Sequence, residues 1–322
     1  MTLAMCCHIV FKANERRDAI ELRRVASVEI STSVQDVCQS ATITLPRNIP
    51  AFLNDELKSL VRRGDEVTIS LGYGGDLRVV DFTGFATRVG ADVPVVIECR
   101  DALWKLLQQP FHKAYKNAYV PDVLNDLVGD SFQVQAMDAS IGPLRVVRGK
   151  KGDVFKALKD EFGLVTYLKN GTVFCGVLFD ANATTATYDM ERNVKSSDLT
   201  YRTADEVSLK VTAKSIKSDG SSIEAVVGDV DGESRTLNYY GIASKEELKK
   251  LAETDMLKFK YDGYEGGLKG FGIPTCMHGD RVRLVSADHP ERNGDYLAES
   301  VSVSFGPGGF ERDIKLAQQW TA

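Results

Sequence analysis

The sequence lacks the features that mark several large classes of protein. Its 322 residues contain no apolar run close to the roughly 20 residues that span a bilayer. The six cysteines and four histidines are scattered, and no Cys-x-x-Cys pair offers the spacing of a structural zinc site. Dispersed cysteines in a chain of this length are typical of buried thiols rather than of a disulfide framework. We therefore expect no membrane span, no metal and no cofactor.

The first residues also lack a targeting signal. The segment Met1 to Cys7 has neither a basic start nor a long apolar stretch, which argues against a secretory signal peptide. The formal net charge is −5, from 45 acidic and 40 basic residues, which argues against a sequence-independent grip on nucleic acid. We expect synthesis and assembly in a cytoplasm.

Motifs of enzyme chemistry are missing as well. The chain has no Gly-x-Ser-x-Gly elbow and no His-Glu-x-x-His helix. Its glycine-rich segments at residues 72–75, 263–267 and 305–310 lack the Lys-Ser/Thr of a phosphate loop, so turns are the better reading. We predict that the protein is not an enzyme and has no catalytic residue.

What the sequence does contain is period-two alternation. Residues 41–45, 67–71 and 300–305 each place apolar side chains on one face and polar ones on the other. Half-buried strands of this kind are typical of antiparallel sheets. Asn170-Gly171, between two such runs, predicts a two-residue hairpin turn. The sequence is therefore mainly β, with two to four small domains expected from its length.

Three short helices complete the expected elements. Pro121 and Asp122 open one that ends at Gly129, and residues 153–162 form a second before Gly163. Ser244 to Glu247 is a capping box, which predicts a third helix towards Lys258. Its buried side is expected to carry three leucines, Leu248, Leu251 and Leu257.

The most informative pattern is an internal repeat. Gly64-Asp65-Glu66-Val67 recurs 215 positions later as Gly279-Asp280-Arg281-Val282, and each copy is followed by a strand, a turn, a longer strand, a turn and a third strand. Glycine permits a tight turn and aspartate bonds the nearby backbone, so Gly-Asp is a mechanical corner. The shared spacing predicts two copies of one small β-barrel.

These segments resemble a known family, the tail hub proteins of contractile-tailed phages of the late-control D type. The family is similar to the N-terminal part of type VI secretion spike proteins. The resemblance covers nearly the whole chain in order. Three groups of residues carry it: residues 64–73 with Phe82-Thr83-Gly84-Phe85, residues 152–171, and residues 279–282 with 291–296 and 308–310.

The resemblance implies an architecture and a function. It implies a mainly β chain with α+β insertions, in which three subunits form a pseudo-sixfold ring that adapts a sixfold tail tube to a threefold spike. The expected partners are two further copies of the chain, the tube protein, a separate spike protein and other baseplate proteins, with no specific nucleic-acid binding. The virion tail or baseplate of a phage or prophage is the expected location. Since the sequence ends at Trp320-Thr321-Ala322 without a β-helical needle, we expect the needle to be a separate protein.

The implied domains are four. Residues 1–100 form the first barrel and residues 101–180 an α+β domain. Residues 181–215 and 270–322 form a second, discontinuous barrel, and residues 216–269 are an inserted α+β segment.

Two other functions stay open at this stage. Exposed aromatics could make the chain a carbohydrate- or cell-wall-binding module, and carboxylate pairs could make it a glycoside hydrolase. The residues concerned are Tyr239, Tyr240, Tyr261 and Tyr264 for stacking, and Asp280 with Asp288 or Glu291 with Asp295 for hydrolysis.

Overall fold

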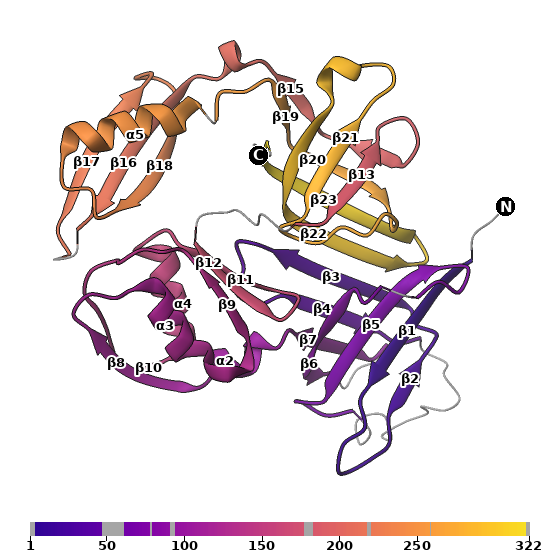
Figure 1. Cartoon of the computed structure of the whole chain (residues 1–322). Helices are drawn as coiled ribbons and strands as arrows, with labels where there is room; N and C mark the ends of the chain where they lie inside the picture. Colours follow the sequence, from indigo (N-terminus) through magenta and orange to yellow (C-terminus); the bar gives the residue numbers. More distant parts are fainter. Residues whose placement is uncertain are drawn as a thin grey trace.

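The computed structural model describes residues 4–46, 61–77, 79–90, 94–176, 183–217, 220–257 and 259–319. A sheet of thirteen strands dominates it and includes elements from both ends of the chain. Figure 1 shows this sheet on the right, a compact α+β unit at lower left, and a small sheet with one helix at upper left. The mainly β class predicted from the sequence is confirmed.

The N-terminal part contributes seven strands to the large sheet. Their spatial order is β3-β4-β7-β6-β5-β1-β2, and every neighbouring pair is antiparallel. The strands are β1 (Met5–Phe11), β2 (Ile20–Leu22), β3 (Ser27–Ser33), β4 (Ser40–Thr44), β5 (Glu66–Tyr73), β6 (Phe82–Val89) and β7 (Val96–Arg100). We call this set the first copy.

The C-terminal part repeats the arrangement. Its order is β14-β20-β23-β22-β21-β13, which matches β3-β4-β7-β6-β5-β1 strand for strand. One pairing differs, because β13 runs parallel to β21 whereas β1 runs antiparallel to β5. The strands of this second copy are β13 (Thr185–Asp189), β14 (Val194–Ser197), β20 (Gly267–Phe271), β21 (Arg281–Val285), β22 (Gly294–Gly306) and β23 (Gly309–Gln319).

A short two-stranded sheet continues the second copy. β15 (Thr200–Arg202) pairs with β19 (Gly263–Glu265) in the register that β14 and β20 begin. Together these four strands correspond to the longer β3 and β4 of the first copy. Residues 203–262 therefore leave and rejoin the second copy where the first copy has only the short link between Ser33 and Ser40.

The inserted segment has its own sheet and core. β16 (Leu209–Ile216) lies between β17 (Ser222–Gly228) and β18 (Glu233–Tyr240), and helix α5 (Lys245–Leu257) packs against β16 and β17. The predicted capping residue Ser244 accepts a hydrogen bond from the Glu247 backbone. Leu248 is buried, but Leu251 is 37% exposed, so the prediction for Leu251 was wrong. The buried stripe continues with Ala252 instead, one turn after Leu248. The side chain of Leu257, the third leucine of that prediction, lies outside what the structure describes.

The α+β unit lies between the two copies in sequence. Its helices α3 and α4 begin and end close to the predicted residues, and Asn170 and Gly171 form the predicted turn, with φ of +50° and +78°. Its elements are α2 (Leu103–Leu107), β8 (Pro110–Tyr115), α3 (Val120–Val128), β9 (Gln133–Ala136), β10 (Leu144–Lys150), α4 (Lys151–Asp160), β11 (Val165–Lys169) and β12 (Thr172–Gly176).

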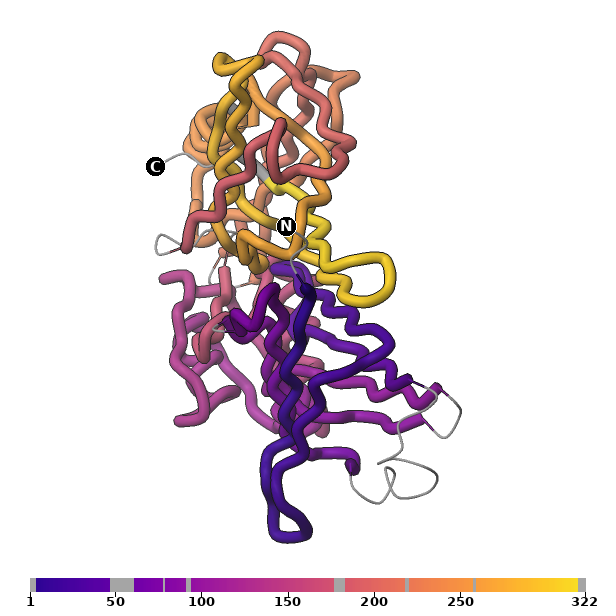
Figure 2. Tube along the Cα trace, turned by 90° about the vertical axis from the view of Figure 1, so that its right-hand side faces the viewer, coloured from indigo at the N-terminus to yellow at the C-terminus, as the bar shows by residue number. Residues whose placement is uncertain are grey.

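The two copies share one continuous hydrophobic core. β22 pairs with β3, so the sheets of the two copies join edge to edge, and buried residues of both belong to a single cluster. Figure 2 shows the β22–β23 hairpin, in yellow, against the indigo and purple strands of the first copy. Among the described residues neither copy closes into a barrel. The two separate barrels are therefore not confirmed and remain a prediction.

Candidate assembly surface

The first Gly-Asp corner is held by four hydrogen bonds. Gly64 has a φ of +94°, a conformation that favours glycine, and its N–H donates to Ala86 O over 2.7 Å. Ala86 N in turn donates to Asp65 O over 2.9 Å. Asp65 N donates to Arg62 O at 3.1 Å, and Arg62 N donates to the carboxylate of Asp65 at 3.0 Å. The aspartate therefore closes its own turn, as expected of an Asp at a corner.

The second corner repeats each of these bonds. Gly279 has a φ of +72° and donates to Ala298 O over 2.8 Å, while Ala298 N donates to Asp280 O over 2.9 Å. Asp280 N donates to Met277 O at 3.1 Å, and Met277 N donates to the Asp280 carboxylate at 2.8 Å. The two Gly-Asp segments thus occupy the same place in the same fold.

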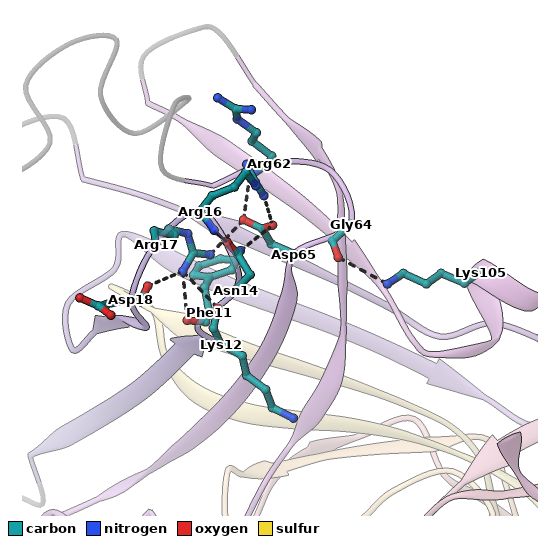
Figure 3. A network of polar contacts seen from close by, with 10 residues as sticks. All are labelled: Phe11, Lys12, Asn14, Arg16, Arg17, Asp18, Arg62, Gly64, Asp65 and Lys105. Carbon is teal, nitrogen blue, oxygen red and sulfur yellow. Dashed lines mark hydrogen bonds and ion pairs between the residues drawn. The ribbon is translucent and has the colours of Figure 1, made fainter.

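The carboxylates differ in their cations. In the first copy, Arg16 and Arg17 from the β1–β2 hairpin reach Asp65 at 2.6 and 2.9 Å, and Asn14 donates to it at 3.2 Å (Figure 3). In the second copy, Asp280 pairs at 2.8 Å with Lys169 of β11, and both side chains are only 5% exposed. The first corner is therefore fastened within its own copy, whereas the second is fastened to the α+β unit.

A β-bulge also recurs in both copies. The pairing of β6 with β7 shifts between Ala86 and Arg88, and that of β22 with β23 shifts between Ala298 and Ser300, which is one β-bulge at equivalent places. These matches make Arg88 and Ser300 equivalent residues.

The turn before each of these strands is closed in the same way. Leu71 N donates to the Asp81 carboxylate at 2.8 Å, and Ser286 N donates to the Asn293 side-chain oxygen at 2.7 Å. The first copy therefore carries an acid where the second carries a neutral amide.

That acid forms the central polar contact between the copies. Asp81 pairs with Arg312 of β23, and both side chains are almost fully buried. The same guanidinium donates to Gly272 O at 2.7 Å and to Cys276 O at 3.3 Å. Tyr73 adds a hydrogen bond from its hydroxyl to Phe310 O at 2.9 Å. Buried charge of this kind is tolerated only with a full set of partners, which the geometry here provides.

Opposite the core, the joined sheet presents a polar face across eight strands, from β14 to β6. Residues opposite one another in successive strands form rows on this face. One row runs through Lys269, Asp313, Ser302, Ser31, Ser40 and Arg100, and the next runs through Phe271, Glu311, Ser304, Glu29, Thr42, Glu98 and Arg88.

The charges of this face are mixed. Glu311 pairs with Lys195, and Lys269 lies 3.9 and 3.8 Å from Glu311 and Asp313. At the other end of the face, exposed Arg88 lies 3.1 Å from Glu98. Between them the face is lined by serine, threonine and the single carboxylate of Glu29, so neither sign dominates it.

A cavity of about 400 Å³ lies where the two copies meet the α+β unit. Its lining includes Asp101, Lys169 and His278. Nε2 of His278 contacts Leu168 O at 3.1 Å, so this nitrogen carries the proton of the neutral ring. Burial lowers the pKa of His278 to about 4, so the ring is neutral at pH 7. Burial also raises the pKa of Asp101, although three groups donate to its carboxylate.

The carboxylate pairs considered for hydrolysis have other roles. Asp280 is held in its buried ion pair, whereas Asp288 is exposed. Arg283 donates twice to Asp295 and lowers the pKa of that carboxyl, which is the opposite of what a general acid requires. Glu291 is exposed beside Arg292.

The tyrosines considered for sugar stacking lie in different clusters. The Tyr239 hydroxyl donates to Asp255 of α5 at 2.8 Å, and Tyr240 donates to the Phe162 carbonyl. Tyr261 and Tyr264 pack against the large core. The structure therefore does not assemble these four rings into one stacking platform.

The described residues form neither a metal-binding cluster nor a membrane-spanning helix. No three His, Cys, Asp or Glu side chains in this part of the chain gather in an arrangement that could hold a metal ion. No helix among the same residues has the length and apolar character needed to cross a membrane.

Comparison with known proteins identifies the fold. No protein-family model and no curated protein matches the sequence. Among solved structures, the 43 kDa tail protein of prophage MuSo2 from Shewanella oneidensis has a TM-score of 0.62 at 14% identity, covering 97% of this chain and 98% of that one. The tail protein from Neisseria meningitidis MC58 has the same score and identity, covering 98% and 96%.

A third similar structure comes from a secretion system. The E. coli c3393 protein, a component of the type VI secretion system described as structurally similar to T4 bacteriophage tail proteins gp27 and gp5, has a TM-score of 0.56 at 10% identity. The alignment covers 92% of this chain and 74% of that one. The chain therefore has the fold of phage tail proteins, and the resemblance drawn from the sequence is confirmed at the level of the fold.

Proposed function

We propose that the protein is a structural component of a phage or prophage tail, a trimeric baseplate hub that joins a sixfold tail tube to a threefold spike. The observation that carries this proposal is the internal repeat, with its shared corner, bulge and strand order. Three chains that each contain two such copies present six similar surfaces. A sixfold tube can dock on those surfaces, while the parts present once per chain keep threefold symmetry for a spike.

The charges of the polar face support a role as the wall of a channel along which DNA passes. Tight binding of duplex DNA requires clustered lysine and arginine, and each phosphate contact would slow passage. On this face the cations lie beside carboxylates or among serines. We propose that this face lines the channel and binds neither DNA nor any cofactor. Tube, spike and other baseplate proteins are then the partners, and the virion tail is the location.

The domain division is part of the same proposal. We place the first copy at residues 1–100 and the α+β domain at 101–180. The sequence predicts a discontinuous second copy, with residues 181–215 and 270–322 around an insertion at 216–269. Because β16 pairs with β17 and β18, and β15 with β19, the paired strands favour a longer insertion, residues 203–262.

The test is the assembly state. Sedimentation analysis over a wide concentration range should give a species of about 106 kDa, three times 35.4 kDa. Electron microscopy of that species should show a ring with a central hole. A monomer at every concentration, together with its absence from the tube end of assembled particles, would contradict the hub. Gel-shift titration should give no duplex-DNA binding near physiological salt, and a steep salt-dependent affinity would contradict the channel wall alone.

A further inference from the structure

The seam between the two copies is a strand pairing with a defined register. β22 and β3 run antiparallel, with Ser300 opposite Ser33 and Phe305 opposite Val28. Side chains alternate along this seam: Val301 and Val303 face the core, whereas Ser302 between them faces the polar side. Within one chain, therefore, a strand of the second copy covers the free edge of the first copy.

The internal repeat defines which strands would form the reciprocal seam. β15 continues β14 and corresponds to β3, since Thr200 opposite Glu265 repeats the pairing of Ser31 opposite Ser40. β6 corresponds to β22, with Arg88 at the place of Ser300 after the shared bulge. The partner of β22 in the first copy is β3, so the counterpart in a second contact is β15 against β6.

Among the described residues both of these edges lack a strand partner. β14 ends the path of the large sheet, and β15 pairs only with β19 among the described residues. In the same part of the structure, Arg88 and Val89 pair with β7 on one side, while β5 reaches no further along β6 than Phe85. Unpaired strand edges are templates for pairing with another chain.

We propose that β15 of one chain pairs with the end of β6 in a second copy of the chain, which repeats the internal seam between subunits. This inference rests on the proposed trimeric hub and names its subunit contact. The equivalent register places Arg202 opposite Arg88, Tyr201 opposite Val89 and Thr200 opposite Gly90. The contact is head to tail, because the two surfaces differ, and such contacts close into a ring when the rotation permits.

The new seam is shorter than the internal one. The internal pairing spans residues 300–305, whereas β6 ends at Val89. In the proposed register two arginines lie opposite each other, but Arg88 has Glu98 and Arg202 has Glu265 as a carboxylate neighbour within its own chain. A short, charged seam predicts that association is reversible and salt-sensitive, in contrast to the permanent seam within the chain.

A pair of cysteines tests the register. Arg88→Cys and Arg202→Cys replace exposed side chains in one protein, which is oxidised at a concentration where the parent sediments as a trimer. The expected product on non-reducing gels is a covalent trimer of about 106 kDa, three times 35.4 kDa. The matched control is Ser31→Cys with Ser302→Cys, exposed and opposite each other in the internal seam, which should form a disulfide within one chain. Single-cysteine variants account for the native thiols.

The outcomes are distinguishable. Covalent trimer from the 88/202 pair, with only internal cross-linking from the 31/302 pair, supports the reciprocal seam. A trimer in solution whose 88/202 pair stays uncross-linked, while the control pair closes, overturns the seam and leaves the hub standing. A protein that is monomeric at all concentrations overturns the hub and the seam together.

Discussion

The two copies are built alike but are fastened differently. Each has a Gly-Asp corner with the same four hydrogen bonds, yet Asp65 is neutralised by arginines of the same copy and Asp280 by Lys169 of the α+β unit. A repeated corner conserves the geometry of the turn because backbone groups define it. Its counter-ion is open to change, and in this chain that change couples the second copy to the α+β unit.

The largest effect should come from the ion pair between the copies. Arg312→Met leaves the buried Asp81 without its cation, and we expect a loss of about 4 kcal/mol in the free energy of unfolding by urea. Adding Asp81→Asn should recover more than half of it. The second copy already closes the same turn with the neutral Asn293, so the amide keeps the bond to Leu71 N. A double variant less stable than Arg312→Met would contradict this account.

The two corners should respond unequally to the same substitution. Asp280→Asn removes the carboxylate partner of a lysine that is 5% exposed, so we expect a loss of about 3 kcal/mol. Asp65→Asn should cost about half as much, because Arg16, at 40% exposure, can turn to solvent and the more buried Arg17 keeps its bonds to the Lys12 and Asp18 carbonyls. Hydrogen exchange separates the two cases: only the first should speed exchange in β11. Equal losses, or equal exchange, would show that the corners are energetically alike.

Acid should weaken the second copy before the first. His278 precedes Gly279, and its equivalent in the first copy is the exposed Arg63. The folded pKa of His278, about 4, lies below the ordinary 6.5, so the unfolded chain binds the proton first as pH falls. Stability is therefore lost between pH 6.5 and 4, by up to about 3 kcal/mol for this group, and then levels off. Urea unfolding of His278→Gln should show a flatter profile over that window, whereas an unchanged slope would assign the loss to other groups.

The smallest effect should be at the exposed edge. Arg88→Ala removes an ion pair whose arginine is 73% exposed. The free energy of unfolding, measured by thermal denaturation, should therefore change by no more than about 0.5 kcal/mol. The result matters for the reciprocal seam, since the cysteine variant at this position must fold normally. A loss above 2 kcal/mol would indicate that Arg88 supports the fold of its own copy.

The sequence predicted the repeat better than it predicted the connections. The Gly-Asp pair at Gly64 and Gly279 recurs with the same downstream spacing, and this made the repeat detectable in the sequence. Both glycines adopt a positive φ, which few other residues tolerate. The cations of the corners were not predictable. Lys169 lies more than a hundred residues from Asp280, and nothing in the sequence distinguishes this buried lysine from an exposed one. The bulge after Ala86 has no sequence signature.

The limits of the insertion were hidden for a similar reason. β16 alternates as strands of the large sheet such as β4 do, so no pattern shows that its partners are β17 and β18. Leu251 was placed in the core by its residue type, but it lies three positions after Leu248, at the rim of the helix face that meets the sheet. Alternation and periodicity predict which face of a strand or helix is buried, but they do not predict which neighbouring element buries it.

The insertion at residues 203–262 has a geometrical consequence. It leaves the second copy at the place where the first copy turns within a few residues, so the two copies are distinguishable from outside by one bulky appendage with its own small core. In the proposed ring, where first and second copies alternate, this appendage would occur at every other position. The insertion would thus lower the sixfold symmetry of the duplicated strands to threefold. A partner that binds the appendages would have three equivalent binding sites, whereas a partner that binds the sheets would have six.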